Sequence, residues 1–199
     1  MRQYQKELDA LIADLDHNPT LLLHSCCGPC SSYVLEYLSQ YFEITVLYFN
    51  PSIYPESEYQ LRLENQKKLL ELTGWAKYID CEYDHSEYLE LIKGTEDAEE
   101  GGARCEICFR QRIFMTAKTA SEKGFEYFAT TLTVSPHKNA ALINKISEEA
   151  ETIFGVKHLP TDFKKKNGYK RSVELSKSFG LYRQDYCGCE FSIRNGDDT

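Results

Sequence analysis

The sequence predicts an α/β fold of three layers, with a parallel sheet between two layers of helices. Strand-like and helix-like segments alternate along the chain, which is typical of parallel βαβ crossovers. The 199 residues are 42% hydrophobic and contain no visible repeat or linker. We therefore expect a single α/β domain over residues 1–199, which would bury about 70% of its unfolded surface.

The first elements follow from apolar spacing. Apolar residues at helical spacing predict an amphipathic helix over residues 3–16, which Asn18-Pro19 ends. The continuous apolar run at 20–24 predicts a buried strand. Residues 31–41 again have helical spacing and are expected to form the second helix.

The middle of the chain repeats the alternation. Residues 43–50 are rich in aliphatic and aromatic side chains and predict a strand closed by Asn50-Pro51. Residues 61–72 predict a helix that ends at Thr73-Gly74. A third strand is expected at 75–80.

The remaining elements are a helical hairpin, a strand and two further helices. A Gly101-Gly102 break separates the hairpin helices, and Gly155 ends the helix that follows the strand. The helices are expected near 84–93, 103–122, 139–154 and 171–179, and the fourth strand at 126–134. The section 156–199 is otherwise expected to be loop that closes the active site.

Charge and hydropathy limit the class of protein. The chain has 31 acidic and 23 basic residues, a net charge of −8. This argues against a protein that coats nucleic acid without selectivity, although it allows a local basic patch. The start has no apolar signal core, and the longest apolar runs are too short to span a bilayer. We therefore expect a cytoplasmic protein with no membrane partner.

The chain has eight cysteines. The cytosol keeps thiols reduced, so closely spaced cysteines in a cytosolic protein indicate metal binding or catalysis. Cys81 stands alone and is interpreted as a buried apolar residue. The other seven fall in three short segments, which indicates one shared site.

The first cysteine group is Cys26, Cys27 and Cys30, at the turn from the first strand into a helix. Ligands of parallel sheets bind beyond the carboxyl ends of the strands, which is where this group lies. The amides of a helix start stabilise thiolates. Residues 27–30 also spell CGPC, the redox motif of thioredoxins, so a thiol–disulfide oxidoreductase is one alternative.

Two further groups follow. Cys105 and Cys108 form a Cys-x-x-Cys pair near a helix start, where both sulfurs can reach one metal or cluster. Cys187 and Cys189 are separated by one residue, a spacing suited to a flexible metal chelate or a redox dithiol. Asp185 beside them is a candidate oxygen ligand or acid.

Counting ligands favours a composite centre. A structural zinc takes four ligands and would leave three of the seven thiols unused. A 4Fe-4S cluster also takes about four cysteines, but a second metal or a redox pair beside it would use the rest. A second alternative, a zinc-stabilised RNA-binding module without catalysis, remains open at this point.

Other candidate residues concern protons and RNA. His137 follows the fourth predicted strand at the same edge of the sheet and could donate a proton or bind an anion. Near the C-terminal end of the chain, a basic stretch interleaved with tyrosines is a candidate RNA-binding surface. Its cations are Lys164, Lys165, Lys166, Lys170 and Arg171.

These segments resemble the cobalamin-independent epoxyqueuosine reductases, which act in the last step of making queuosine in tRNA. The matching stretches run from about residue 20 to 192. They are LLLHSCCGPCSS at 21–32, YFNPSIYPESEYQLR at 48–62, RCEICFRQR at 104–112, TTLTVSPHKN at 130–139 and DFKKKNGYKRSVELSKSFGLYRQDYCGCEFS at 162–192.

The resemblance implies a sheet like that of the adenine-nucleotide α-hydrolase (HUP-like) group. It implies a 4Fe-4S cluster with an additional mononuclear iron, tRNA carrying epoxyqueuosine as substrate, and an external electron donor. By its motifs, Cys26, Cys27, Cys105 and Cys108 are the expected cluster ligands. Cys187 and Cys189 are the expected second-metal or redox pair, and Cys30 could belong to either set. For the reaction itself, we expect His137, Asp185 or a nearby tyrosine to protonate the departing oxygen.

Overall fold

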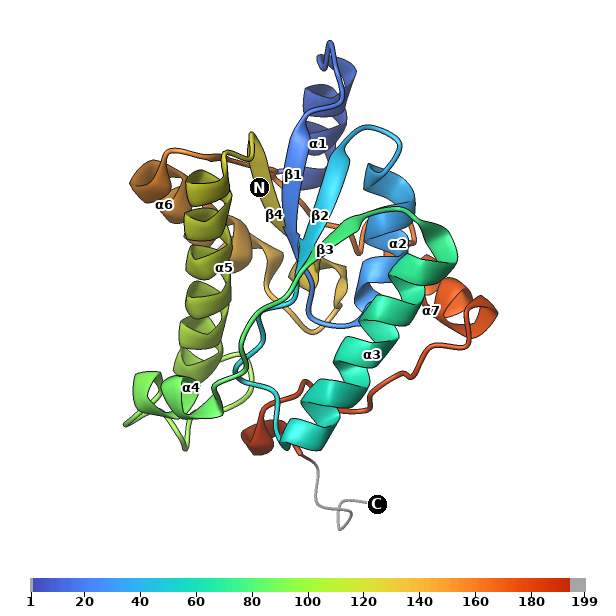
Figure 1. The fold of residues 1–199 in the computed structure, drawn as a ribbon. Coiled ribbons are helices and arrows are strands. Elements are labelled where there is room, and N and C mark those ends of the chain that lie inside the picture. Colours follow the sequence, from blue (N-terminus) through green and yellow to red (C-terminus); the bar gives the residue numbers. More distant parts are fainter. Residues whose placement is uncertain (1, 194–199) are drawn as a thin grey trace.

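A computed structural model describes residues 2–193 and contains a five-stranded sheet. All neighbouring strands run parallel, in the order β3-β2-β1-β4-β5. The strands are β1 (Thr20–His24), β2 (Glu43–Leu47), β3 (Lys77–Ile79), β4 (Tyr127–Thr130) and β5 (Lys157–His158). The predicted parallel α/β fold is confirmed (Figure 1).

Helices connect the strands. The α-helices are α1 (Tyr4–Ala13), α2 (Gly28–Leu38), α3 (Glu56–Thr73), α4 (His85–Leu91), α5 (Ala103–Lys123), α6 (Ala140–Phe154) and α7 (Gly168–Ser178). There are also two short 3-10 helices in the described residues. η1 (Thr131–Val134) directly follows β4, and η2 (Glu190–Ser192) is the last element. Among the described helices, none combines the length and apolar character needed to cross a bilayer.

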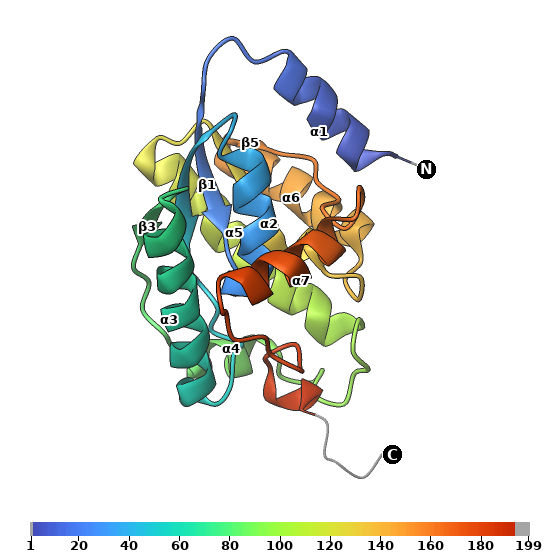
Figure 2. The same ribbon diagram turned by 90° about the vertical axis from the view of Figure 1, so that its right-hand side faces the viewer.

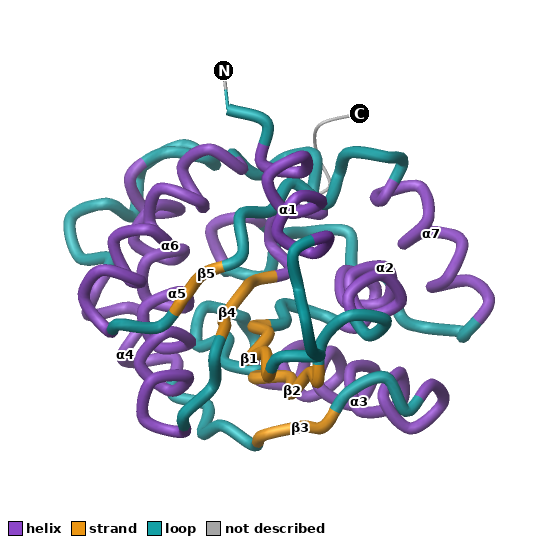
Figure 3. Tube along the Cα trace, turned by 90° about the horizontal axis from the view of Figure 1, so that it is seen from above, coloured by secondary structure: helices purple, strands orange, loops and turns teal. Residues whose placement is uncertain are grey.

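The sheet lies between two helical layers (Figure 3). Successive strand residues point to opposite faces, so each face builds its own core. Leu21 and Leu23 of β1 pack with α2, α3 and α7, and Leu8 of α1 joins this core. Leu22 points the other way and packs with α5 and α6.

β1 lies at the centre of the sheet, with β2 on one side and β4 on the other. The chain therefore leaves β1 and β4 in opposite directions, and the loops after these two strands diverge. Such a switch point is where α/β sheets bind ligands. The turn from β1 into α2 carries the first cysteine group, and η1 follows β4 at the same end.

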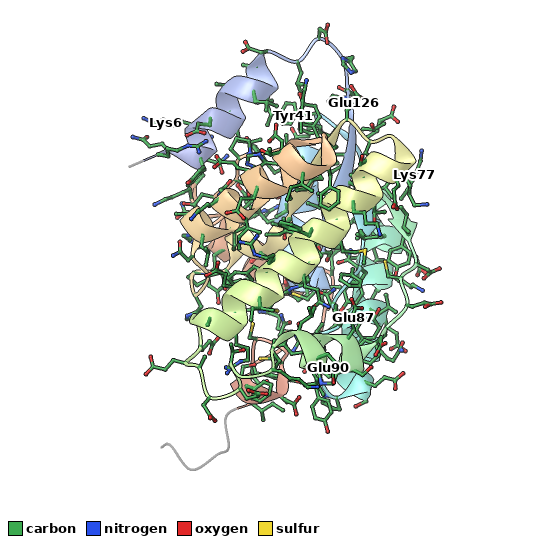
Figure 4. The ribbon with its side chains drawn as sticks, turned by 90° about the vertical axis from the view of Figure 1, so that its left-hand side faces the viewer. Lys6, Tyr41, Lys77, Glu87, Glu90 and Glu126 are labelled. Carbon is green, nitrogen blue, oxygen red and sulfur yellow. The ribbon has the colours of Figure 1, made fainter. Side chains whose placement is uncertain are left out.

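The distant cysteine segments reach this same end of the molecule. In Figure 4, Glu126 and Lys77 mark the ends at which β4 and β3 begin, while Glu87 and Glu90 of α4 lie at the opposite end. The section after α7 runs to that end and finishes near α4 (Figure 1). α7 itself packs against α2 (Figure 2).

Some predicted boundaries are wrong. The strand expected at 126–134 ends at Thr130, because the Thr130 side chain accepts a hydrogen bond from the amide of Leu132 and the chain turns into η1. α3 begins at Glu56, earlier than predicted, with two glutamates favouring its first turn. β5 was not predicted, because two residues carry no periodicity.

Candidate metal centre

Cys26, Cys27 and Cys30 form the tighter of two thiol groups. Their sulfur atoms all lie within 4.8 Å of one another, and the Sγ atoms of Cys26 and Cys27 are 3.9 Å apart. Cys27 is the extended N-cap of α2, and Pro29 fits the first helical turn. The turn from strand to helix therefore points three thiols at one place.

The contacts among these three thiols favour a thiolate at Cys26 over Cys27 and Cys30. The pKa of Cys26 lies well below its usual range, because hydrogen bonds from Cys27 and Cys30 stabilise its thiolate. The pKa of Cys27 is raised to about 12, first by its hydrogen bond to Cys26. The pKa of Cys30 lies well above its usual range, first because of its hydrogen bonds to Cys26 and Cys27. A bound cation would relieve this mutual repulsion and allow all three to ionise.

The second thiol group combines Cys105 and Cys108 of α5 with Cys187 and Cys189 of the C-terminal section. Cys108 and Cys189 are buried together against Tyr88. Burial raises the pKa of Cys105, and the thiols of Cys187, Cys108 and Cys189 add to that rise. Two segments about 80 residues apart in the chain are thus neighbours in space.

Two cations lie between the groups. Arg112 is buried, and its Nη2 donates to the Cys108 sulfur at 2.9 Å. Burial alone would lower the pKa of Arg112, but Cys108, Cys187 and Cys26 raise it overall. Lys138 behaves likewise: burial opposes its charge, but Cys187, Cys26 and Cys30 keep its pKa above the usual value. Both cations therefore favour thiolates in the two groups.

A cavity of about 460 Å³ joins the site to solvent. This volume falls in the range of small-molecule sites, about 300–1,000 Å³. Its lining includes thiols from both groups, the cations between them, and two residues predicted to donate protons. These residues are Cys26, Cys30, Cys187, Arg112, Lys138, His137 and Asp185.

The chemistry of this donor set fits a metal–sulfur centre. Gln184 Nε2 donates to the Cys27 sulfur at 3.0 Å, and the Gly101 amide donates to the Cys105 sulfur at 3.2 Å. Such N–H donors are the outer contacts that tune metal-bound thiolates. The buried hydroxyl of Tyr48 has no hydrogen-bond partner among the described residues. Burial raises the pKa of Tyr48 most strongly, and a thiolate at Cys27 would raise it further.

The predicted RNA-binding cations lie on and before α7, and several are held by carboxylates. Lys164 pairs with Asp162 at 2.9 Å, and Lys166 with Asp9 at 2.6 Å. Arg171 pairs with Glu36 and Glu174. Among residues 2–193, no carboxylate lies within ion-pair distance of Lys165 or Lys170. Their role in binding RNA stays a prediction.

All seven predicted cysteines, His137 and Asp185 thus lie in or beside one region. Cys30 belongs spatially with Cys26 and Cys27. Arg112, Gln184 and Arg62 were not singled out from the sequence, although Arg112 follows Cys108 by one helical turn and so shares its face. Cys81 takes no part in either group and is half-buried.

The solved structures include a similar fold. The U34-tRNA thiolase NcsA of Methanococcus maripaludis, solved with its 4Fe-4S cluster, superposes with a TM-score of 0.56. The match covers 96% of this chain and 67% of that one at 13% identity, so it shows the fold alone. It confirms the predicted likeness to the HUP-like α/β group.

Curated relatives extend over nearly the whole chain. The chain is 42% identical to the epoxyqueuosine reductase QueH of Staphylococcus epidermidis, over 98% of this chain and 87% of that protein. It is 35% identical to the QueH of Thermotoga maritima, over 87% of this chain and 90% of that protein. The family model described as epoxyqueuosine reductase QueH matches residues 21–195. The chain therefore belongs to the epoxyqueuosine reductase QueH family.

Proposed function

We propose that this protein removes the epoxide oxygen of epoxyqueuosine in tRNA and leaves the alkene of queuosine. The observation that carries the proposal is a cavity at the switch point of the sheet that is lined by thiols of both cysteine groups, Cys26 and Cys30 of one and Cys187 of the other. The family supplies the substrate, and the similar fold of a tRNA thiolase with a 4Fe-4S cluster supports both RNA and iron–sulfur chemistry.

The reaction needs two electrons and two protons for each epoxide, whose oxygen leaves as water. When bound, a 4Fe-4S cluster with an adjacent iron supplies electrons one at a time and a Lewis acid for the oxygen. An external donor must provide the two electrons, because a thiol or cluster that is oxidised in one turnover must be reduced again before the next.

The cysteines are the proposed ligands. Cys26, Cys27, Cys105 and Cys108 are proposed to hold the cluster, and Cys187 with Cys189 to hold the second iron or act as a redox pair. Loss of a cluster ligand should remove acid-labile sulfide, whereas loss of Cys187 should remove iron and keep sulfide. Sulfide that survives the loss of Cys26 would instead assign the tight group, with Cys30, to the single iron.

Residues of the cavity wall are proposed to handle protons and substrate. His137 and Asp185 are exposed and line the cavity, so either can exchange protons with water and deliver one to the departing oxygen. Tyr169 is 41% exposed at the rim, with the Arg183 guanidinium 6.0 Å from its ring centre. This pair offers a stacking surface for a base splayed from the anticodon loop.

The other two functions fit less well. A thioredoxin-like cysteine must be reachable by its partner, yet Cys27 is fully buried and would begin the CGPC motif. A zinc-stabilised RNA-binding module would leave three thiols without a use. It would also have no use for a cavity that reaches both thiol groups.

The test is turnover under anaerobic conditions. Purified protein, a chemical reductant and tRNA carrying epoxyqueuosine are incubated, and the nucleosides are analysed by mass spectrometry. We expect loss of one oxygen atom from the modified nucleoside, with no conversion by the Cys108→Ser variant and full conversion by Cys81→Ser. Absence of conversion by iron-loaded wild-type protein would refute the proposal.

A further inference from the structure

One face of α3 contacts two cysteine-bearing segments: the turn that carries Cys26 and Cys27, and the C-terminal segment that carries Cys187. Arg62 and Gln66 are one helical turn apart and therefore lie on the same face. Arg62 contacts the segment of Cys187, and Gln66 contacts the turn of Cys26 and Cys27. We propose that Arg62 is a positioning residue which, together with Gln66, aligns the two thiol groups across the cavity.

Arg62 holds the C-terminal cysteine segment by its backbone. The side chain is 2% exposed. Its Nη1 donates to the carbonyl of Cys187 at 3.0 Å, and Nη2 donates to the carbonyl of Tyr186 at 3.3 Å. The guanidinium also lies over the Tyr186 ring. A planar fork with several donors makes all these contacts at once, which a lysine cannot do.

The charge of Arg62 is paired within the same unit. Its Nε donates to Glu58 Oε1 at 2.7 Å, one turn earlier on α3. The hydroxyl of Tyr182 donates to Glu58 Oε2 at 3.2 Å. Burying a guanidinium is costly unless it is paired and its donors are used. Here its free donors are used on the backbone of one cysteine segment, which points to alignment rather than to bulk stability.

Gln66 holds the other segment. It is fully buried, and its Oε1 accepts from the hydroxyls of Ser25 at 2.6 Å and Ser31 at 2.8 Å. These serines flank the Cys26–Cys30 turn on both sides. Gly28 within the turn lies so close to α3 that an added Cβ would be 2.9 Å from the carbonyl oxygen of Asn65. The turn is therefore seated on the helix backbone.

The glycine of the Cys-Gly-Cys segment supports this inference independently. Gly188 has φ of +131°, a region that side-chain-bearing residues rarely adopt. A Cβ there would lie 3.0 Å from Arg62 Nη1 and 3.2 Å from Ile53. The residue between Cys187 and Cys189 is thus small because Arg62 approaches it. Gly188→Ala should displace the same contact from the other side.

The experiment compares Arg62→Met, Arg62→Lys and Gly188→Ala with Lys68→Met in anaerobically purified protein. Lys68 is the control, because it donates from the same helix to Gly180, outside the cysteine segment. Amide hydrogen exchange of the peptide covering 182–189, the electron paramagnetic resonance spectrum of bound iron, and kcat and KM for tRNA are measured. Melting temperature reports general damage.

We expect Arg62→Met and Gly188→Ala to speed exchange in this peptide, alter the iron spectrum and lower kcat by roughly tenfold or more, the scale of lost outer-shell support. KM for tRNA and exchange elsewhere should stay close to wild type, Arg62→Lys should recover part of the loss, and Lys68→Met should resemble wild type. Unchanged exchange and spectrum in Arg62→Met, or the same changes in Lys68→Met, would overturn the inference. If Arg62→Met fails to fold, Gly188→Ala and Arg62→Lys decide by the same criteria.

This inference rests on the proposed function for its effect on kcat and on the iron spectrum. Hydrogen exchange of the 182–189 peptide does not depend on turnover. A wild-type protein without iron would refute the proposed function, whereas an unaltered exchange pattern in Arg62→Met would refute the alignment role.

Discussion

Replacing Arg112 by Met tests whether the buried cation between the thiol groups retains the metal centre. Met has a similar length and no charge, so it fills much of the same space while removing the cation. Because removing one partner of a buried ionic contact also destabilises a fold, the melting temperature is measured beside iron release. The variant loses the 2.9 Å hydrogen bond from Nη2 to the Cys108 sulfur. It also loses the positive charge that faces Cys108, Cys187 and Cys26.

The expected magnitude follows from that hydrogen bond. A hydrogen bond that involves a charged group contributes about 1.5–3 kcal/mol. A loss of about 2 kcal/mol corresponds to roughly a 30-fold weaker retention of the centre. Removing outer contacts of metal ligands typically lowers metal affinity or activity by roughly 10–100-fold, which includes this value.

The assay follows iron release from anaerobically purified protein in the presence of a chelator. Arg110→Met is the matched control: Arg110 is on the same helix two residues earlier, but it is partly exposed and pairs with Glu149 and Glu106. A surface pair of that kind contributes at most about 1 kcal/mol. Iron release from Arg112→Met at the wild-type rate, or equal release from both variants, would refute this reasoning.

Four further predictions concern RNA binding and stability. Lys165→Ala or Lys170→Ala should each lower the salt dependence of tRNA binding by about one phosphate contact, and Lys166→Ala by less because Asp9 holds Lys166; equal slopes in titrations at several salt concentrations would contradict this. Tyr169→Ala should weaken tRNA binding by about 1–3 kcal/mol and Tyr169→Phe should preserve it, as expected for stacking; equal affinities would remove Tyr169 from the surface. Gly168→Ala should lower the melting temperature sharply, since its Cβ would lie 1.9 Å from the carbonyl oxygen of Phe163, and overpacking of this kind costs about 1–3 kcal/mol; an unchanged melting temperature would argue against this packing. Burial opposes the charge of Asp9, but hydrogen bonds from Lys166, Gln5 and Tyr37 keep its pKa below the usual value. The stability that Asp9 contributes is therefore present above about pH 4 and lost on acidification. Asp9→Asn should narrow the melting-temperature difference between neutral and acidic buffer, and an unchanged difference would contradict this role of Asp9.

The sequence was sufficient to predict the alternation of strands and helices, because buried strands and amphipathic helices have distinct apolar patterns. It also placed Cys26 and its neighbours at the carboxyl end of β1, where the structure has them. Short elements escaped prediction. β5 has only two residues, and η1 looks like strand until the Thr130 side chain is seen to turn the chain.

The site could be predicted only in its ligand types. The seven cysteines fall in three short segments of the sequence, so all of them could be identified as candidate ligands from their spacing alone. Which thiols are neighbours depends on the tertiary path: the Cys187 segment meets Cys105 and Cys108 because the section after α7 runs back across the sheet end. Arg62 and Gln184 act through contacts more than 120 residues away in the chain, and no local pattern reports those.

Metal and sulfide analysis of anaerobically purified protein tests the central claim most directly, since the claim is that seven thiols hold a composite iron–sulfur centre. A cubane cluster with one further iron predicts roughly five irons and four acid-labile sulfides per chain, and fewer of both in the Cys108→Ser variant. A protein that holds a single zinc, with no sulfide and undiminished conversion of epoxyqueuosine, would contradict the account.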